Sequence, residues 1–288
     1  MTRFGMLLLL GIIVLFLPLP RAGAQPPALF PAEVPRAEPE ERRPESRFED
    51  AIETDRDSFT PATRTAGRGR FIVESSYSFI DNRRGPETHS FPELLLRYGV
   101  RERLELRLGW NYEIGGGGNV VSGTVGEDVL GPTTSEEGRM LYGFKAAVTE
   151  QARWVPGSAL ILQGFTPTAG EATDTQLLVG YVFGWELPRR WKLDAAFRYN
   201  SDSEEEDRFS VWAPSVVLKV PVMERVNVHG EYFGLFSRDK AEDFVRHFFS
   251  PGVHYLITPD LEVGVRLGWG LNDQSARFFT NVGVGWRF

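Results

Sequence analysis

Residues 277–288 read RFFTNVGVGWRF, and their side chains alternate in character along an extended chain. One face of such a strand carries Thr280, Val282, Val284, Trp286 and Phe288, and the other carries Asn281, Gly283, Gly285 and Arg287. A final strand that turns an apolar face to lipid and stops on an aromatic residue is typical of bacterial outer-membrane β-barrels. Trp286 and Phe288 are therefore predicted to form the signal that the barrel-assembly machinery reads.

The same alternation recurs from residue 70 onward. In the stretch 104–114, apolar residues occupy every even position, whereas Glu105, Arg107, Asn111 and Glu113 fall on the other face. A period of two held over the whole stretch predicts a β-strand. Twelve strands are expected, at 70–80, 91–98, 104–114, 139–149, 158–166, 175–186, 191–200, 208–220, 226–236, 246–257, 261–270 and 277–288. Pro214 lies inside the eighth strand and predicts a bulge or a break there.

The first 24 residues have the features of a secretory signal peptide. Arg3 supplies a positive charge, residues 6–19 are almost all apolar, and Ala22-Gly23-Ala24 is a small-residue cleavage site. Residues 25–60 are rich in proline, glutamate and arginine, which predicts an extended periplasmic arm without a core of its own. The expected organisation is a signal peptide at 1–24, an arm at 25–60 and a β-barrel at 61–288.

Composition excludes several classes of protein. The chain has no cysteine, which rules out a lipid-anchored lipoprotein, disulfides and thiolate metal sites. Its formal net charge is −7, and loss of Arg3 and Arg21 with the signal peptide would make it −9. Nucleic acid is not an expected partner, because phosphate binding requires a positive surface. No membrane-spanning helix is expected after the signal peptide, since no apolar run there reaches about 18 residues.

The expected connections alternate in length. Short ones fall at 99–103, 187–190, 221–225 and 258–260, whereas longer or more polar ones include 115–137 and the acidic stretch 201–207. Short periplasmic turns opposite longer extracellular loops are typical of outer-membrane barrels. An even number of strands then places both ends of the barrel in the periplasm.

Alternation alone does not decide which face meets lipid, because a soluble lipocalin-like barrel also alternates with its apolar face inward. Twelve strands favour the membrane barrel, since about eight already make an interior that side chains can fill. Aromatic residues also gather near both strand ends, as in interfacial belts. The polar faces then line the lumen, and the candidates are Arg97, Glu105, Arg107, Glu113, Lys145, Asp194, Arg198, His229, Glu231, Glu262, Arg266 and Arg287.

Four stretches carry a family resemblance: 52–61 (IETDRDSFTP), 92–110, 252–272 and the terminal GVGWRF. They resemble the outer-membrane transporter family named for the meta-pathway of phenol degradation. The first stretch matches the family motif Thr-Asp-Arg-Pro-Asp-Phe-Thr at Thr54, Asp55, Arg56, Phe59 and Thr60, but Asp57-Ser58 replace Pro-Asp. The resemblance implies a location among outer-membrane lipids and a transport role. The strand pattern itself predicts an all-β, up-and-down, antiparallel transmembrane barrel. The family name suggests aromatic or other hydrophobic solutes.

The expected function is passive passage of small solutes, with no enzymatic activity and no cofactor. No metal is expected either, since the four histidines lack metal-ligand spacing. Asp55 and Arg56 are candidates for a plug at the periplasmic mouth, because they can pair with lumen charges. Two alternatives remain. A lipid hydrolase would need a nucleophile beside a histidine such as His229, and the sequence has no nucleophile-elbow motif. A structural or adhesive barrel would bind a surface partner through its loops.

Overall fold

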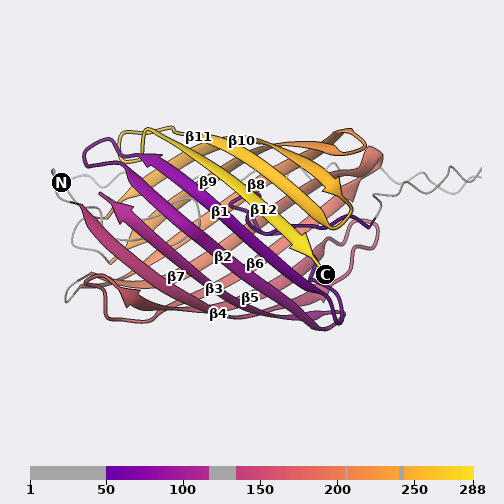
Figure 1. Cartoon of the computed structure of the whole chain (residues 1–288), viewed down its shortest axis with the longest axis horizontal. Helices are drawn as coiled ribbons and strands as arrows, with labels where there is room; N and C mark the ends of the chain where they lie inside the picture. The colour runs from indigo at the N-terminus through magenta and orange to yellow at the C-terminus, as the bar shows by residue number, and fades with distance from the viewer. Residues whose placement is uncertain (1–49, 117–133, 205–206, 240–242) are drawn as a thin grey trace, which may run out of the picture. The chain divides into compact units, whose positions relative to one another are not determined.

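The computed structural model of the chain describes residues 50–116, 134–204, 207–239 and 243–288. The predicted signal peptide and most of the predicted arm lie outside these residues. Twelve antiparallel strands form a closed barrel in which each strand pairs with the next and β12 pairs with β1 (Figure 1). This architecture confirms the predicted all-β, up-and-down fold.

Eight of the strands are longer than the sequence pattern indicated, three have the expected length, and the last is shorter. Their bounds are β1 Phe71–Asp81, β2 Thr88–Arg101, β3 Leu104–Gly115, β4 Ser135–Thr149, β5 Gly157–Ala169, β6 Gln176–Leu187, β7 Trp191–Glu204, β8 Asp207–Met223, β9 Val226–Arg238, β10 Val245–Thr258, β11 Leu261–Gly270 and β12 Phe278–Arg287. A 3-10 helix, η1 Pro188–Arg190, joins β6 to β7. Among the described residues, no helix has the length and apolar character needed to span a membrane.

The first and last strands close the barrel in continuous register. Their pairing runs from Ile72 opposite Arg287 to Asp81 opposite Phe278. The backbone of Phe288 extends this ladder, because its N–H donates to the carbonyl of Phe71 at 2.8 Å. The alternating C-terminal stretch therefore forms the closing seam, and its role as an assembly signal stays a prediction.

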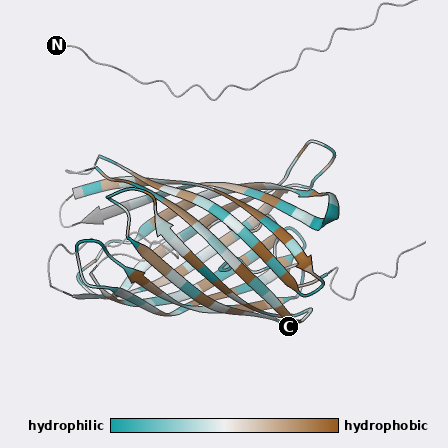
Figure 2. Ribbon diagram, turned by 90° about the horizontal axis from the view of Figure 1, so that it is seen from above, coloured by the Kyte–Doolittle hydropathy of each residue, from teal (hydrophilic) through white to brown (hydrophobic). Residues whose placement is uncertain are grey.

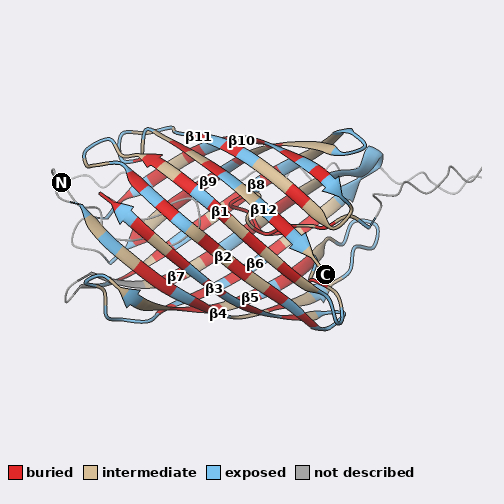
Figure 3. Cartoon of the chain, viewed as in Figure 1, coloured by how far each residue is buried: buried red, intermediate tan, exposed pale blue. Residues whose placement is uncertain are grey.

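Buried and exposed residues alternate along the strands (Figure 3), and most charged strand residues are buried inside while many large apolar ones are exposed outside. On β3, Glu105 and Arg107 are buried, whereas Leu106 and Leu108 are about half exposed. Hydrophobic and hydrophilic residues alternate along the strands accordingly (Figure 2). Apolar side chains exposed around a whole barrel are stable in lipid and not in water. The structure thus favours the membrane barrel over the soluble one.

The two ends of the barrel carry different connections. At one end, which we call the short-turn end, β2–β3, β8–β9 and β10–β11 are joined through 102–103, 224–225 and 259–260. The opposite, long-loop end has connections such as 82–87, 170–175 and 271–277. The strand β1 starts and β12 ends at the short-turn end, as the even strand count requires.

Two local predictions were wrong. β8 runs through Pro214 without a bulge or break, because Trp212 and Ser215 keep one register with β9 and Pro214 lies opposite Phe197 of β7. A proline removes a single N–H, and the ladder absorbs that loss locally. The acidic stretch 201–207 is largely strand, since β7 and β8 continue pairing as far as Glu204 and Asp207.

A cation on the outer face should destabilise this fold. Val282 of β12 points outward and is 49% exposed. We expect Val282→Arg to lower the free energy of unfolding in lipid vesicles by about 2–4 kcal/mol, since a guanidinium near the bilayer centre loses its hydration. Leu271→Arg, at an exposed site in the connection after β11, is the matched control with an expected cost of about 0–1 kcal/mol. Equal losses for both variants, measured by urea titration of tryptophan fluorescence, would contradict the lipid-facing assignment.

Candidate functional site in the barrel lumen

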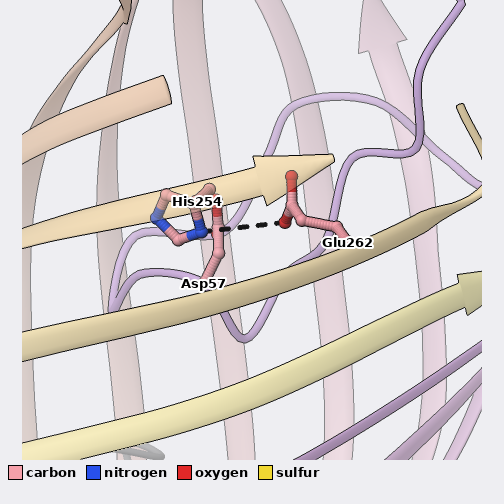
Figure 4. A group of neighbouring side chains, drawn as sticks. All are labelled: Asp57, His254 and Glu262. Atoms are coloured by element: carbon pink, nitrogen blue, oxygen red, sulfur yellow. Dashed lines mark ion pairs between the residues drawn. The ribbon is translucent and has the colours of Figure 1, made fainter. Parts of the chain in front are cut away.

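Residues 50–70, which we call the lumenal segment, precede β1; their middle part lies inside the barrel, and their two ends lie exposed at its rim. The segment enters at the short-turn end, where the N–H of Ile52 donates to the carbonyl of Pro259 at 2.7 Å. Its residues Ile52, Asp55, Phe59 and Thr60 are all buried. With the front of the barrel cut away, the segment is seen looping between the strands (Figure 4). It therefore occupies the lumen that the predicted wall residues enclose.

The carboxylate of Asp55 lies among three cations of the wall. Its Oδ2 atom lies 2.5 Å from Arg107 Nη1 on β3, and both oxygens lie 3.1 Å from Lys145 Nζ on β4. Arg97 Nη1 on β2 is 3.8 Å from Oδ1. Burial alone would raise the pKa of Asp55, but the charges of Arg97, Lys145 and Arg107 outweigh it and hold the pKa well below its ordinary value. The carboxylate is therefore ionised at neutral pH.

Two wall glutamates complete this group, which we call the Asp55 cluster. Arg97 lies 3.0 Å from a carboxylate oxygen of Glu74 and 3.0 Å from one of Glu105. Arg107 lies 3.1 Å from Glu105. The cluster thus holds three carboxylates and three cations, all buried. Its charges balance only when Asp55 is in place, and buried charges are stable only when they are paired.

The wall also binds the backbone of the lumenal segment. Three glutamates accept hydrogen bonds from its N–H groups at 2.7–2.9 Å: Glu74 from Asp55 and Arg56, Glu231 from Phe59 and Thr60, and Glu105 from Ala66. Because the segment forms no strand or helix, these amides would otherwise be buried without partners. The glutamates therefore substitute for a secondary structure that the segment lacks.

An aromatic layer lies beyond Phe59, toward the long-loop end. The Phe59 ring stacks on the Phe233 ring with the centroids 4.1 Å apart. The guanidinium carbon of Arg198 also lies over the Phe59 ring, 3.7 Å from its centroid. Phe248 and Phe279 continue the cluster from β10 and β12. The lumen is therefore not uniformly polar, and Phe59 fixes the middle of the segment against its apolar part.

Spaces of different size lie along the lumen. At the short-turn end, a vestibule of about 970 Å³ is lined by Glu53, Arg64, Lys192 and Asp194, among others. Another pocket, of about 520 Å³, lies at the long-loop rim and is lined mainly by connection and outward-facing residues such as Asp174, Ser201 and Arg208. Where the lumenal segment faces β2 to β7, the cavity measures about 60 Å³, which is room for only a few water molecules.

The remaining predicted lumen residues are also placed inside the barrel. Arg266 pairs with Glu231 at 3.3 Å, and Glu262 accepts a hydrogen bond from Thr54 Oγ1 at 2.9 Å. His229 Nδ1 lies 2.7 Å from Nε2 of His254, a histidine that the candidate set did not include.

Three predicted residues lie apart from this centre. Glu113 is buried on β3 near the long-loop end, opposite Glu137 of β4. Asp194 lines the vestibule, and Arg287 binds Asp260 at the short-turn rim with its Nε atom 2.7 Å from Oδ1.

Arg56, the second predicted plug candidate, also contacts the wall. Its Nη2 atom donates to Asn111 Oδ1 at 3.0 Å and to the carbonyl of Leu94 at 3.1 Å. Its Nη1 atom lies 3.9 Å from Glu93.

Sequence reasoning missed several residues that bind the segment. Glu74, Glu93 and Lys219 contact Asp55, Arg56 and Asp57 respectively, and Phe233 contacts Phe59. The sequence pattern did indicate that Phe233 points inward, since it lies on the same face of its strand as His229 and Glu231. The inward orientation of Lys219 could not be predicted, because both faces of β8 are fairly apolar.

A closed β-barrel with apolar side chains outside and charged side chains inside is an outer-membrane β-barrel. The chain belongs to the family described as "Putative MetA-pathway of phenol degradation", whose model matches residues 54–288.

A comparison with solved structures gave several outer-membrane barrels. An outer-membrane channel from Pseudomonas putida F1 superimposes with a TM-score of 0.56 at 11% identity, over 78% of this chain and 98% of that one. The NanC porin gives a TM-score of 0.49 at 10% identity, over 75% and 98% of the two chains. The translocator domain of the autotransporter NalP from Neisseria meningitidis gives 0.47 at 11% identity, over 77% and 89%. A comparison with curated protein sequences gave no match.

Neutralising Asp55 should release the lumenal segment. We expect Asp55→Asn to weaken its docking by about 3 kcal/mol, roughly a hundredfold in the ratio of docked to released segment, because three buried cations lose their shared anion. The chain has no cysteine, so Ser58→Cys supplies a unique probe at a site that is 2% exposed. The rate of labelling by a polar maleimide reports release.

Asp50→Asn is the matched control, since Asp50 lies on the same segment but is exposed and pairs with Arg70 at the rim. Its labelling rate should equal that of the Ser58→Cys parent. A rate in the Asp55→Asn variant that also equals the parent's would refute the anchoring role of Asp55.

Proposed function

We propose that this protein is an outer-membrane channel for small solutes, closed in this conformation by the lumenal segment. The observation that carries the proposal is the cavity of about 60 Å³ between the segment and the wall of β2 to β7. It is far smaller than the vestibule at the short-turn end, and it is too small for any organic solute. Passage therefore requires the segment to move.

The lining of this cavity supports a class of solute. Apolar residues of the wall, including Leu141, Ile161 and Phe165, line it together with Arg107 and Arg198. An apolar surface with guanidinium groups in the same lining suits a ring that carries one hydroxyl or carboxylate, because the ring is removed from water while the polar group keeps a donor. The family's description refers to phenol degradation, so phenol and benzoate are the first solutes to test.

The contacts of the segment are suited to reversible opening. Glu74, Glu105 and Glu231 bind its amides through hydrogen bonds, and Asp55 binds through ion pairs. Water can replace each of these contacts, so release costs less than the unfolding of a packed apolar core would. We assign the segment the role of a plug on these grounds.

The enzymatic alternative receives less support. A hydrolase needs an activated nucleophile beside a histidine. Among the described residues, the hydrogen bond of His229 and His254 joins the two rings to each other, and their remaining ring nitrogens have no hydroxyl partner. The pair also faces the lumen rather than the lipid. Release of fatty acid from phospholipid by purified protein, abolished in a His229→Ala variant, would reverse this judgement.

Removing the plug should open the channel. We expect deletion of residues 50–66 to raise single-channel conductance in a planar bilayer several-fold over the full-length protein, because the mid-lumen space becomes continuous with both mouths. Phenol or benzoate should reduce the conductance of the deletion variant, whereas a sugar of similar size should not, since it lacks an apolar face. Asp50→Asn serves as the control that keeps the segment and should conduct like the parent.

A folded deletion variant with unchanged conductance would contradict the plug. A conductance that rises but responds equally to phenol and sugar would contradict the proposed solute class alone. Folding is verified by the shift in electrophoretic mobility on heating, which distinguishes a silent barrel from an unfolded one.

A further inference from the structure

Three potential metal ligands converge between the lumenal segment and the wall. Asp57 comes from the segment, His254 from β10 and Glu262 from β11 (Figure 4). One ligand atom from each lies within 4.8 Å of the other two. Asp57 is distant from the other two in the sequence, and His254 and Glu262 lie on two different strands, so the group follows no sequence motif for metal binding.

One atom of this group is a buried nitrogen without a partner. His254 is 3% exposed, and among the described residues its Nδ1 atom has no hydrogen-bond partner. The nearest acceptor of the group, Glu262 Oε1, is 3.7 Å away, beyond hydrogen-bond distance (Figure 4). Buried ring nitrogens are ordinarily satisfied, so an unpartnered one aimed at a carboxylate needs a reason.

There is space for an ion beside this nitrogen. A cavity of about 20 Å³ is lined by Asp57, His254 and Glu262, which is room for one water-sized species. Gly264 of β11 also lines it, and a Cβ atom there would stand only 2.6 Å from His254 Nδ1. A glycine at this position keeps the approach to the nitrogen open.

The neighbouring groups orient the three residues. His229 Nδ1 lies 2.7 Å from His254 Nε2, so His254 can donate from Nε2 and leave Nδ1 as a lone pair. Thr54 Oγ1 donates to Glu262 at 2.9 Å, and Lys219 Nζ donates to Asp57 at 2.7 Å. Such outer hydrogen bonds fix the tautomer and direction of metal ligands in proteins. Asp57 and Glu262 supply two carboxylates, and the other charged groups beside them are Lys219, Arg56, Glu74 and Arg266, so the surroundings are formally neutral.

We propose that Asp57, His254 and Glu262 form a binding site for a divalent transition-metal ion, with Zn²⁺ as the representative. One imidazole and two carboxylates are ligands of Zn²⁺, and a water molecule completes the tetrahedron. Bonds of about 2.0–2.2 Å require the three groups to close in by about 1 Å. The imidazole disfavours Mg²⁺ and Ca²⁺, which take oxygen ligands. The bound ion ties the lumenal segment to β10 and β11.

The test is metal binding by the purified full-length protein, stripped with a chelator and titrated with Zn²⁺ or Mg²⁺ in a calorimeter. We expect one Zn²⁺ per chain and binding of Mg²⁺ at least tenfold weaker. Asp57→Asn and His254→Gln should each weaken Zn²⁺ binding at least tenfold. His247→Gln is the matched control and should bind like the parent, because His247 contacts Tyr232 and lies away from the group.

Absorption spectroscopy at the zinc edge adds a second readout. It should show nitrogen and oxygen neighbours at about 2.0–2.2 Å. If His254→Gln fails to fold, Asp57→Asn keeps the test valid, because Asp57 lies outside the strands. Absence of one-site Zn²⁺ binding, or binding that survives both substitutions, would overturn the proposal. Neither outcome depends on whether the barrel conducts.

Discussion

One buried carboxylate, that of Asp55, is the interaction on which the interior of this barrel depends. Arg97, Arg107 and Lys145 converge on it from three neighbouring strands, and Glu74 and Glu105 neutralise only part of their charge. Without Asp55, the wall would hold three buried cations against two anions, a state that is costly unless water or a solute anion enters. Docking of the lumenal segment therefore completes the charge balance of the wall.

Different interactions stabilise the two sides of the barrel wall. Outside, apolar side chains gain from contact with lipid, and their alternation with inward residues sets the register of every strand. Inside, polar groups stabilise a segment that has no secondary structure. Its apolar contacts are the Phe59 stack on Phe233 and the packing of Ile52 and Ala66 in a cluster with wall residues. The outer face thus stabilises the barrel whether or not the segment is docked, which allows the lumen to change state while the fold persists. A metal ion held by Asp57, His254 and Glu262 would bias that change toward the docked state.

The sequence predicts the barrel well because alternation is a local signal. The strands, their antiparallel order and the inward side of residues such as Glu105 and Arg107 all follow from a period of two. Asp55 and Arg56 were selected for their charges, and their role as a plug stays a prediction. The contacts between the lumenal segment and the wall could not be predicted from the sequence. Contacts such as Thr54 with Glu262 or Phe59 with Glu231 depend on the closure and tilt of the whole barrel. Pro214 misled the prediction because a propensity rule ignores how a long strand tolerates one missing hydrogen bond.

The most direct test of the account is a reversible covalent lock between the segment and the wall. A Cβ atom added to Gly285 of β12 would lie 3.6 Å from the Cβ atom of Thr54, which suits a disulfide. In a protein without other cysteines, Thr54→Cys with Gly285→Cys should cross-link on mild oxidation and stay at low conductance, and reduction should restore opening. Failure to cross-link in the folded protein, or a cross-linked barrel that conducts like the segment deletion, would contradict a lumen closed by residues 50–70.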